Sequence, residues 1–264
     1  MKKKKYLLFI LLSCFCVLLV IFLQSYSHKQ IINKIYSHRG ASGEEIEHSF
    51  QAYYLALLYG SRNIEQDLVT SKDGTLYVSH DDSAKRLTGV DRLYSEMTDD
   101  EINHLETNNH QHILRLQDVF DRYKKTTHYV IELKENDKQV DLFEKIIKQN
   151  NMEKQVTVQA RTLTSLEKIK RTFPNMKTLV LAKDELEAKN ACRMDYVDIV
   201  SLHSKFMSKD IIQMIHDANK QANFWTLNSM DDINKAIDLG ADSYFTNYTA
   251  KAIELEKDAR SFFH

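Results

Sequence analysis

The chain is 264 residues long, with 43% hydrophobic and 28% charged residues, which suits a globular protein with one large core or two small ones. Its net charge is -1, and its basic residues cluster only at positions 2–5, so a nucleic-acid partner is not expected. Only Cys192 lies beyond the first 23 residues, which excludes a disulfide within the rest of the chain.

The N-terminus is predicted to anchor the protein in a membrane. Four lysines at positions 2–5 precede an apolar run over residues 6–23 that contains no charged residue and is long enough for one transmembrane helix. Basic residues before such a run favour export of the chain that follows it. We therefore expect a single-pass cell-membrane protein whose folded domain is extracytoplasmic.

The apolar run is not followed by a clear small-residue cleavage site, which favours a retained signal anchor over a removed signal peptide. A lipoprotein modified at Cys14 is a third alternative. We divide the chain into a signal anchor at residues 1–23, a polar stem at 24–34 and a single folded domain at 35–264.

From residue 35 onward, short apolar segments alternate with segments of helical periodicity. The predicted strands cover residues 35–38, 63–70, 129–134, 156–159, 178–181, 197–202, 223–227 and 243–246. Eight such units are the number found in a (β/α)8 TIM barrel, so we predict an α/β fold of this type. An additional strand is expected at residues 76–79, after the turn at Asp73-Gly74.

Two further segments have distinctive patterns. Residues 230–239 have a helical apolar stripe, with acidic residues in the first turn and Gly240 at the end as a C-cap. Residues 82–116 are polar and lack a clean period, and we expect them to form a loop and a short helix over the mouth of the barrel.

Chemically capable residues are concentrated in the first half of the chain. They are His38-Arg39-Gly40, then Glu65-x-Asp67 followed by Asp73-Gly74 and His80-Asp81, and then Glu132-x-Lys134. Residues two apart on a strand point to the same face. The active site of a TIM barrel forms where its strands end. This pattern therefore indicates a metal-assisted site that acts on a phosphodiester.

The ordered set of motifs resembles the glycerophosphodiester phosphodiesterase family. H-R-G, then E-x-D-x-x-x-[ST]-x-D-G-x-x-x-x-x-H-D, then I-E-L-K keep the family's order and spacing. Residues 224–228 (F-W-T-L-N) stand where the family has W-T-[VL]-N, and residues 240–247 (G-A-D-S-Y-F-T-N) are similar to G-[VA]-D-G-[IV]-x-T-D. The resemblance covers most of the predicted domain.

Three carboxylates are candidate metal ligands. Glu65, Asp67 and Glu132 offer hard oxygen atoms, which suit Mg²⁺ or Ca²⁺ completed by water and a substrate phosphate. The resemblance assigns the metal to the same three residues. The phosphate oxygens are expected to bind Arg39 and Lys134. Arg39 offers a planar guanidinium fork, and Lys134 offers the point charge of an ammonium group.

Two histidines are the candidate catalytic residues. His38 and His80 come from different strand ends, so one could take a proton while the other donates one. The resemblance implies this same acid and base pair. Whether water attacks the phosphorus directly, or a neighbouring glycerol hydroxyl first forms a cyclic phosphate, is left open, and the resemblance favours the hydroxyl.

Three more residues are candidates for a substrate wall: Glu47, Trp225 and Asn228. Two departures from the family pattern concern the loops. Ile46 replaces a common proline, and Asn247 replaces the usual aspartate, a change that we expect to affect loop structure more than chemistry.

The expected function is metal-dependent hydrolysis of glycerophosphodiesters to an alcohol and glycerol phosphate at the outer face of a membrane. Substrates derived from phospholipids, or a polyglycerophosphate of a cell envelope, fit this location. One alternative is a lysophospholipase D or a phosphoinositide-cleaving barrel. Another, suggested by Ile46 and Asn247, is a non-catalytic barrel that binds a surface.

Overall fold

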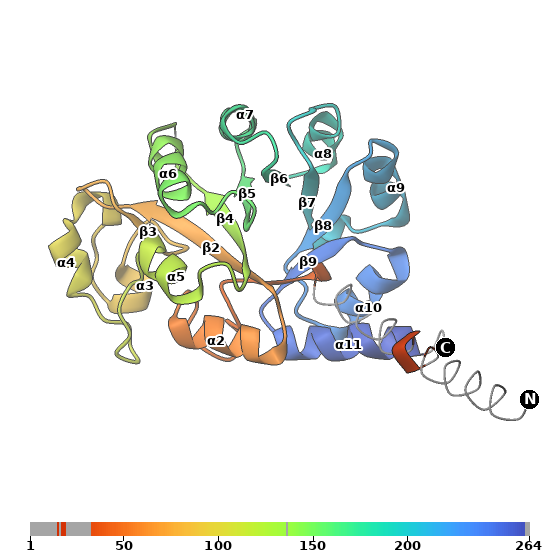
Figure 1. Ribbon diagram of the computed structural model, residues 1–264, viewed down its shortest axis with the longest axis horizontal. Helices are drawn as coiled ribbons and strands as arrows, with labels where there is room; N and C mark the ends of the chain where they lie inside the picture. Colours follow the sequence, from red (N-terminus) through yellow and green to blue (C-terminus); the bar gives the residue numbers. More distant parts are fainter. Residues whose placement is uncertain (1–14, 16, 20–32, 136, 262–264) are drawn as a thin grey trace, which may run out of the picture.

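The computed structural model describes residues 15, 17–19, 33–135 and 137–261, and in this part of the chain eight parallel strands close into a barrel (Figure 1). The barrel strands are β1 (Ile35–Ser37), β2 (Asn63–Thr70), β4 (His128–Leu133), β5 (Val156–Ala160), β6 (Lys177–Ala182), β7 (Ile199–His203), β8 (Gln221–Trp225) and β9 (Ser243–Thr246). Strand β1 pairs with both β2 and β9, which closes the ring. The predicted (β/α)8 barrel is confirmed.

Each barrel strand is followed by a helix that covers the outside of the ring. These helices are α2 (Phe50–Tyr59), α5 (Leu116–Tyr123), α6 (Asp137–Asn150), α7 (Leu163–Thr172), α8 (Glu185–Ala191), α9 (Lys209–Asp217), α10 (Met230–Leu239) and α11 (Thr249–Ser261). A short 3₁₀ turn, η2 (Ser204–Phe206), precedes α9. The predicted helix at residues 230–239 has the expected bounds, and Gly240 caps it with a left-handed φ of 78°.

The strands have apolar residues on both faces because both faces are buried. All eight residues of β2 are buried. One set of strand residues packs with the helices in the main core, as Ile64, Ile131 and Leu202 do. The other set, including Val130 and Ile199, fills the inside of the barrel. This packing explains why the strands appear in the sequence as short continuous apolar runs.

The additional strand β3 (Leu76–Val78) pairs antiparallel with β2 and begins an insertion before α5. The insertion contains α3 (Lys85–Thr88), the 3₁₀ turn η1 (Tyr94–Glu96) and α4 (Asp99–Asn103), and it lies beyond β3 in Figure 1. It has a small apolar core of its own, in which Tyr94, Met97 and Ile102 pack against Tyr77. The expectation of one short helix was therefore too simple.

The predicted membrane span at residues 6–23 lies almost wholly outside the described residues, as does most of the predicted stem. Among the residues that are described, no helix combines the length and the apolar character needed to cross a membrane.

Candidate active site

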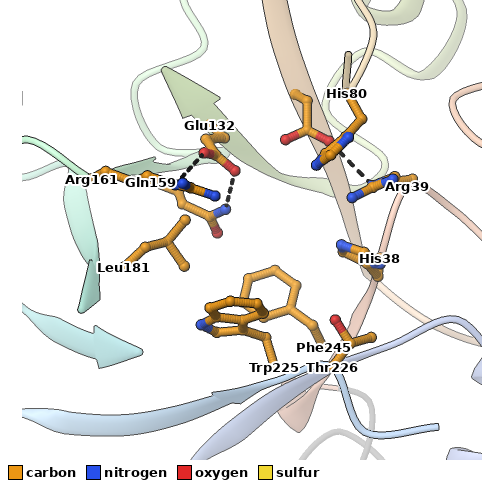
Figure 2. A pocket seen from close by; sticks show the side chains of 11 residues that line it. His38, Arg39, His80, Glu132, Gln159, Arg161, Leu181, Trp225, Thr226 and Phe245 are labelled. Atoms are coloured by element: carbon orange, nitrogen blue, oxygen red, sulfur yellow. Dashed lines mark hydrogen bonds and ion pairs between the residues drawn. The ribbon is translucent and has the colours of Figure 1, made fainter. Parts of the chain in front are cut away.

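The strand ends on one side of the barrel surround a hollow of about 100 Å³. Six of the residues predicted from the sequence line it: His38, Arg39, Asp67, His80, Glu132 and Trp225. Five residues that the sequence analysis did not single out complete the lining: Gln159, Arg161, Leu181, Thr226 and Phe245. Figure 2 shows the polar side chains along two sides of this hollow and the rings of Trp225 and Phe245 along a third.

Three buried carboxylates meet at one point of the site. Glu65, Asp67 and Glu132 each place a ligand atom within 4.8 Å of the others. The strand register brings this about, because Asp67 on β2 stands opposite Glu132 on β4, and Glu65 points to the same face of β2 two residues earlier. The predicted cluster is therefore present in the fold.

Each carboxylate accepts a hydrogen bond through one of its oxygen atoms. Glu65 Oε2 accepts the backbone N–H of Arg39 at 2.8 Å, and Arg39 presents this N–H from a left-handed backbone with φ of 58°. Asp67 Oδ2 accepts a hydrogen bond from His48 Nε2 at 3.0 Å. Glu132 Oε2 accepts the amide N–H of Gln159 at 2.9 Å. Such contacts fix the orientation of groups that hold a metal ion.

The electrostatics of the cluster favour a bound cation. Burial raises the pKa of Glu65 well above its usual range, and the charge of Asp67 adds to the effect. Burial and the charge of Asp67 raise the pKa of Glu132 to about 8. Burial acts in the same direction on Asp67, but its pKa is lowered because His48 and Arg39 outweigh that effect.

Three close carboxylates thus oppose each other's ionisation, and a divalent cation would relieve this repulsion. Their oxygen atoms are the type that Mg²⁺ and Ca²⁺ prefer. The donor set therefore fits the predicted hard divalent ion.

His38 is held as a neutral ring with a defined tautomer. Its Nδ1 donates to the side-chain oxygen Oδ1 of Asn247 at 2.7 Å, which leaves Nε2 with a lone pair. Burial, and then the charge of Arg39, lowers the pKa of His38 to about 4. A neutral imidazole with a free Nε2 can accept a proton, so His38 is suited to act as a base.

His80 has a different type of partner. Its Nδ1 donates to the carboxylate of Asp81 at 2.8 Å, and Arg86 Nε in turn donates to the other oxygen of Asp81. This contact orients the ring and leaves Nε2 as the nitrogen that can exchange a proton with the substrate. In the view of Figure 2, the side chain of Arg39 lies between the rings of His38 and His80. His80 is therefore suited to act as the acid.

Lys134 does not lie where the sequence analysis placed it. It follows the end of β4, and its Nζ donates to the backbone carbonyl of His80 and pairs with Asp82 Oδ1 at 3.6 Å. It lines a second hollow of about 710 Å³, beside the first. His80 lines both hollows. In the first hollow the cation next to Glu132 is Arg161, whose Nε lies 3.8 Å from Glu132 Oε1.

The insertion flanks the site and does not cover the first hollow. Its residues Ser83, Lys85 and Leu93 line the second hollow, and none from 82–116 lines the first. The segment predicted to lie over the barrel mouth therefore borders the second hollow, which His80 also lines, and not the first.

Two of the three predicted wall residues lie behind the first hollow. Glu47 pairs with the guanidinium of Arg86 at 2.7 Å and of Arg39 at 3.3 Å. The side chain of Asn228 accepts the backbone N–H of Asn247 at 2.9 Å. Both residues therefore position other side chains of the site. Trp225 does line the first hollow, as predicted.

Several residues with clear contacts were missed. His48 links Asp67 to the hydroxyl of Tyr53, and its place directly after the candidate Glu47 could have identified it. Asn247 was noted as a loop change, although it holds the ring of His38. Gln159 and Arg161 stand at the end of β5 without any nearby motif to identify them.

Comparisons with known proteins agree with this geometry. Residues 38–251 match the model of the glycerophosphoryl diester phosphodiesterase family. A glycerophosphodiester phosphodiesterase of Bacillus subtilis (strain 168) is 27% identical over 245 residues, covering 80% of this chain and 82% of the relative.

Solved structures share the fold. A phosphodiesterase from Oleispira antarctica, solved in complex with the product sn-glycerol-3-phosphate, has a TM-score of 0.76, 20% identity, and coverage of 85% of this chain and 96% of its own. A glycerophosphodiester phosphodiesterase from Agrobacterium tumefaciens str. C58 has a TM-score of 0.74, 20% identity, and coverage of 84% and 99%.

Proposed function

Because the chain belongs to the glycerophosphoryl diester phosphodiesterase family, we propose that it hydrolyses glycerophosphodiesters to an alcohol and glycerol phosphate. The observation that supports this most directly is the pair His38 and His80 in one hollow with the carboxylates of Asp67 and Glu132. The partner of the His38 ring is a neutral amide, whereas the partner of the His80 ring is a negatively charged carboxylate. This difference assigns them separate roles in proton transfer.

Glu65, Asp67 and Glu132 would hold a divalent cation, either Mg²⁺ or Ca²⁺. When bound, such an ion neutralises charge on the phosphate oxygens and polarises the phosphorus toward attack. Arg39 lies on the same wall and offers a guanidinium fork to the same phosphate. Arg161 supplies a second guanidinium from the opposite wall.

The proton transfers follow from the two histidine environments. Nε2 of His38 takes the proton from the attacking hydroxyl, which belongs either to water or to the glycerol carbon next to the ester. His80, oriented by Asp81, gives a proton to the leaving alkoxide. In a hydroxyl-first route the two residues exchange roles when water opens the cyclic phosphate. We favour that route because the glycerol would lie beside His38.

The shape of the site suggests where each half of the substrate lies. The first hollow, of about 100 Å³, has apolar contacts from Trp225, Phe245 and Leu181 and is of a size for a glycerol unit. The second hollow is larger and open, and His80 stands between the two. We therefore place the glycerol in the first hollow and the leaving group in the second. A long acyl chain on the glycerol has less room, which disfavours the lysophospholipase D alternative.

The location of the reaction rests on the N-terminal sequence. Four lysines and an uncharged run over residues 6–23 support an anchored, extracytoplasmic domain. Substrates at this position would be deacylated phospholipids or a polyglycerophosphate of the envelope. Labelling of a cysteine introduced at exposed Leu186 by a membrane-impermeant maleimide on intact cells tests the topology. Labelling only after cell lysis would contradict it.

The activity is tested by phosphorus NMR of the products from glycerophosphocholine, glycerophosphoglycerol and a polyglycerophosphate, with and without a chelator. We expect glycerol phosphate from at least one diester, loss of the reaction with chelator, and recovery with Mg²⁺ or Ca²⁺. His38→Ala is the inactive control, and His104→Ala, at an exposed histidine, is the matched active one. No product from any of the three diesters would refute the proposal.

A further inference from the structure

A third hollow, with a polar lining, lies at the opposite end of the barrel from the candidate active site. Its volume is about 460 Å³, within the range of small-molecule sites. The residues around it come from the beginnings of the barrel strands, among them Asn63 on β2, Thr157 on β5 and Ser243 on β9. It therefore shares no lining residue with the hollow that contains His38 and His80.

Three cations line this hollow, and each of them contacts a neutral acceptor. Lys34 Nζ donates to the carbonyl of Ala241 at 3.3 Å, and Arg62 Nη1 donates to the carbonyl of Thr126 at 3.2 Å. Lys177 Nζ donates to the side-chain oxygen of Gln221 at 3.0 Å.

In the described part of the chain, no carboxylate lies within ion-pair distance of Lys34, Arg62 or Lys177, so their positive charge is not cancelled locally. Cations held around a concave surface without acidic partners attract anions.

The one acidic residue at the rim is engaged elsewhere. Asp242 Oδ2 accepts a hydrogen bond from His216 Nε2 at 2.7 Å and one from the backbone N–H of Ala222 at 2.7 Å. The neighbouring His128 is uncharged at neutral pH, because burial and then the charge of Lys177 lower its pKa to about 4. Three cations therefore face the hollow against one carboxylate that already has two donors.

We propose that this hollow is a second anion site, which binds a phosphate group at the amino-terminal end of the barrel. The guanidinium of Arg62 offers a planar fork to phosphate oxygens, and the two ammonium groups offer point charges. Thr157 and Ser243 add hydroxyl groups to the lining, where they contact His128 Nε2 and the side-chain amide of Asn223, each at 2.8 Å. The site is independent of the proposed hydrolase activity, because none of its residues belongs to the catalytic hollow.

Two classes of ligand could carry the phosphate group, and the experiment must distinguish them. One is a free phosphate or a soluble phosphate monoester. The other is the headgroup of an anionic lipid, because Asn33 and Lys34 at the rim are the last residues of the short stem that we expect to follow a membrane segment. Both sources offer the same phosphate oxygens to the same three cations.

The ring of His128 provides a local probe of this site. A phosphate bound beside it would oppose the effect of Lys177 and raise the pKa of His128. The full chain, with ¹³C-labelled histidine, is placed in nanodiscs, and the His128 signal is identified by its loss in His128→Gln. Inorganic phosphate and glycerol phosphate are titrated into phosphatidylcholine discs. In another arm, phosphatidylglycerol discs are used without added phosphate.

The test variant is Lys34→Gln/Arg62→Gln/Lys177→Gln. The matched control, Lys72→Gln/Lys209→Gln/Lys235→Gln, removes three exposed charges outside the hollow. We expect a saturable shift of the His128 signal in the wild type and the control. In the test variant we expect binding to weaken about tenfold or more. A shift on phosphate addition identifies a soluble ligand, and a shift only in phosphatidylglycerol discs identifies a lipid headgroup.

The alternative is that these cations only stabilise nearby helix ends, as Lys34 could do through the carbonyl of Ala241 beyond α10. In that case the test variant would melt at a lower temperature, but the His128 signal would not respond to phosphate in any arm. That result would overturn the proposal. An equal response in the test variant and the wild type would overturn it as well. Lys177→Arg, which keeps the charge, should retain the response.

Discussion

The ring of His38 is held by the side chain of Asn247, whose amide oxygen accepts the Nδ1 proton at 2.7 Å. The two residues are 209 positions apart in the chain. They meet because β1 and β9 are neighbours and Ser37 stands opposite Thr246. Asn228 supports the contact by accepting the backbone N–H of Asn247. Burial and the charge of Arg39 keep the imidazole uncharged, and the contact of Nδ1 with Asn247 leaves its Nε2 free.

The first prediction concerns this contact. Asn247→Asp places a carboxylate beside His38 and should raise its pKa from about 4, by about one unit or more. His38 must be neutral to accept a proton, so a raised pKa leaves it protonated over a wider acidic range. The acidic limb of the kcat/KM profile should therefore move to higher pH. Asn190→Asp, which adds the same charge at an exposed position, should leave the profile unchanged. Identical profiles for wild type and Asn247→Asp would contradict the assigned role of Asn247.

The second prediction separates the two histidines by leaving group. His38→Ala and His80→Ala should both lower kcat on glycerophosphocholine by about 10²-fold to 10⁴-fold, because each removes a proton carrier. A nitrophenyl ester of glycerol phosphate needs no acid, since nitrophenolate is a weak base. His80→Ala should recover most of its rate on that ester, and His38→Ala should not. Recovery by His38→Ala in place of His80→Ala would reverse the two assignments.

The third prediction is a stability effect of the carboxylate cluster. In metal-free protein, Glu132 has a folded pKa of about 8, well above the ordinary value of 4.5 for a glutamate. Between these two values the folded state binds a proton that the unfolded state has released, so stability falls as pH rises from about 5 to 8. The loss should be on the order of a few kcal/mol.

Denaturant unfolding at pH 5 and pH 8 with a chelator measures this loss. Glu132→Gln should flatten the decline, whereas Glu185→Gln at an exposed site should not. Addition of Mg²⁺ or Ca²⁺ to the wild type should stabilise it most at pH 8, where the carboxylates are ionised. A metal-free protein with equal stability at both pH values would argue against crowding of the three acids.

The fourth prediction compares Arg161 and Lys134, two cations that line different hollows. Arg161 lines the first hollow, so Arg161→Gln should raise KM several-fold, as expected for loss of one exposed charge contact to the phosphate. Lys134 instead holds the backbone carbonyl of His80. Lys134→Met should therefore lower kcat about tenfold with little change in KM. If Lys134→Met raises KM and Arg161→Gln does not, the direct phosphate contact belongs to Lys134.

The sequence by itself determined the elements of the fold and the types of residue in the site. Strands β2 and β9 have the bounds that were expected, and the other strands differ by one or two residues at their ends. This worked because buried parallel strands leave a local signature, a short apolar run between turns. The carboxylates and both histidines could be identified because each lies in a short motif on or next to a strand.

Only the tertiary structure decided which side chains meet. Lys134 shares a motif with Glu132, yet its ammonium turns toward the second hollow, because β4 ends at Leu133 and the alternation of faces ends with it. Arg161 stands in no such motif, and Asn247 replaces the aspartate that ends one. They join the site through the pairing of β4 with β5 and of β1 with β9. Strand register between distant segments is set by packing of the whole barrel. For that reason, local patterns predict the strands but not all the partners across them.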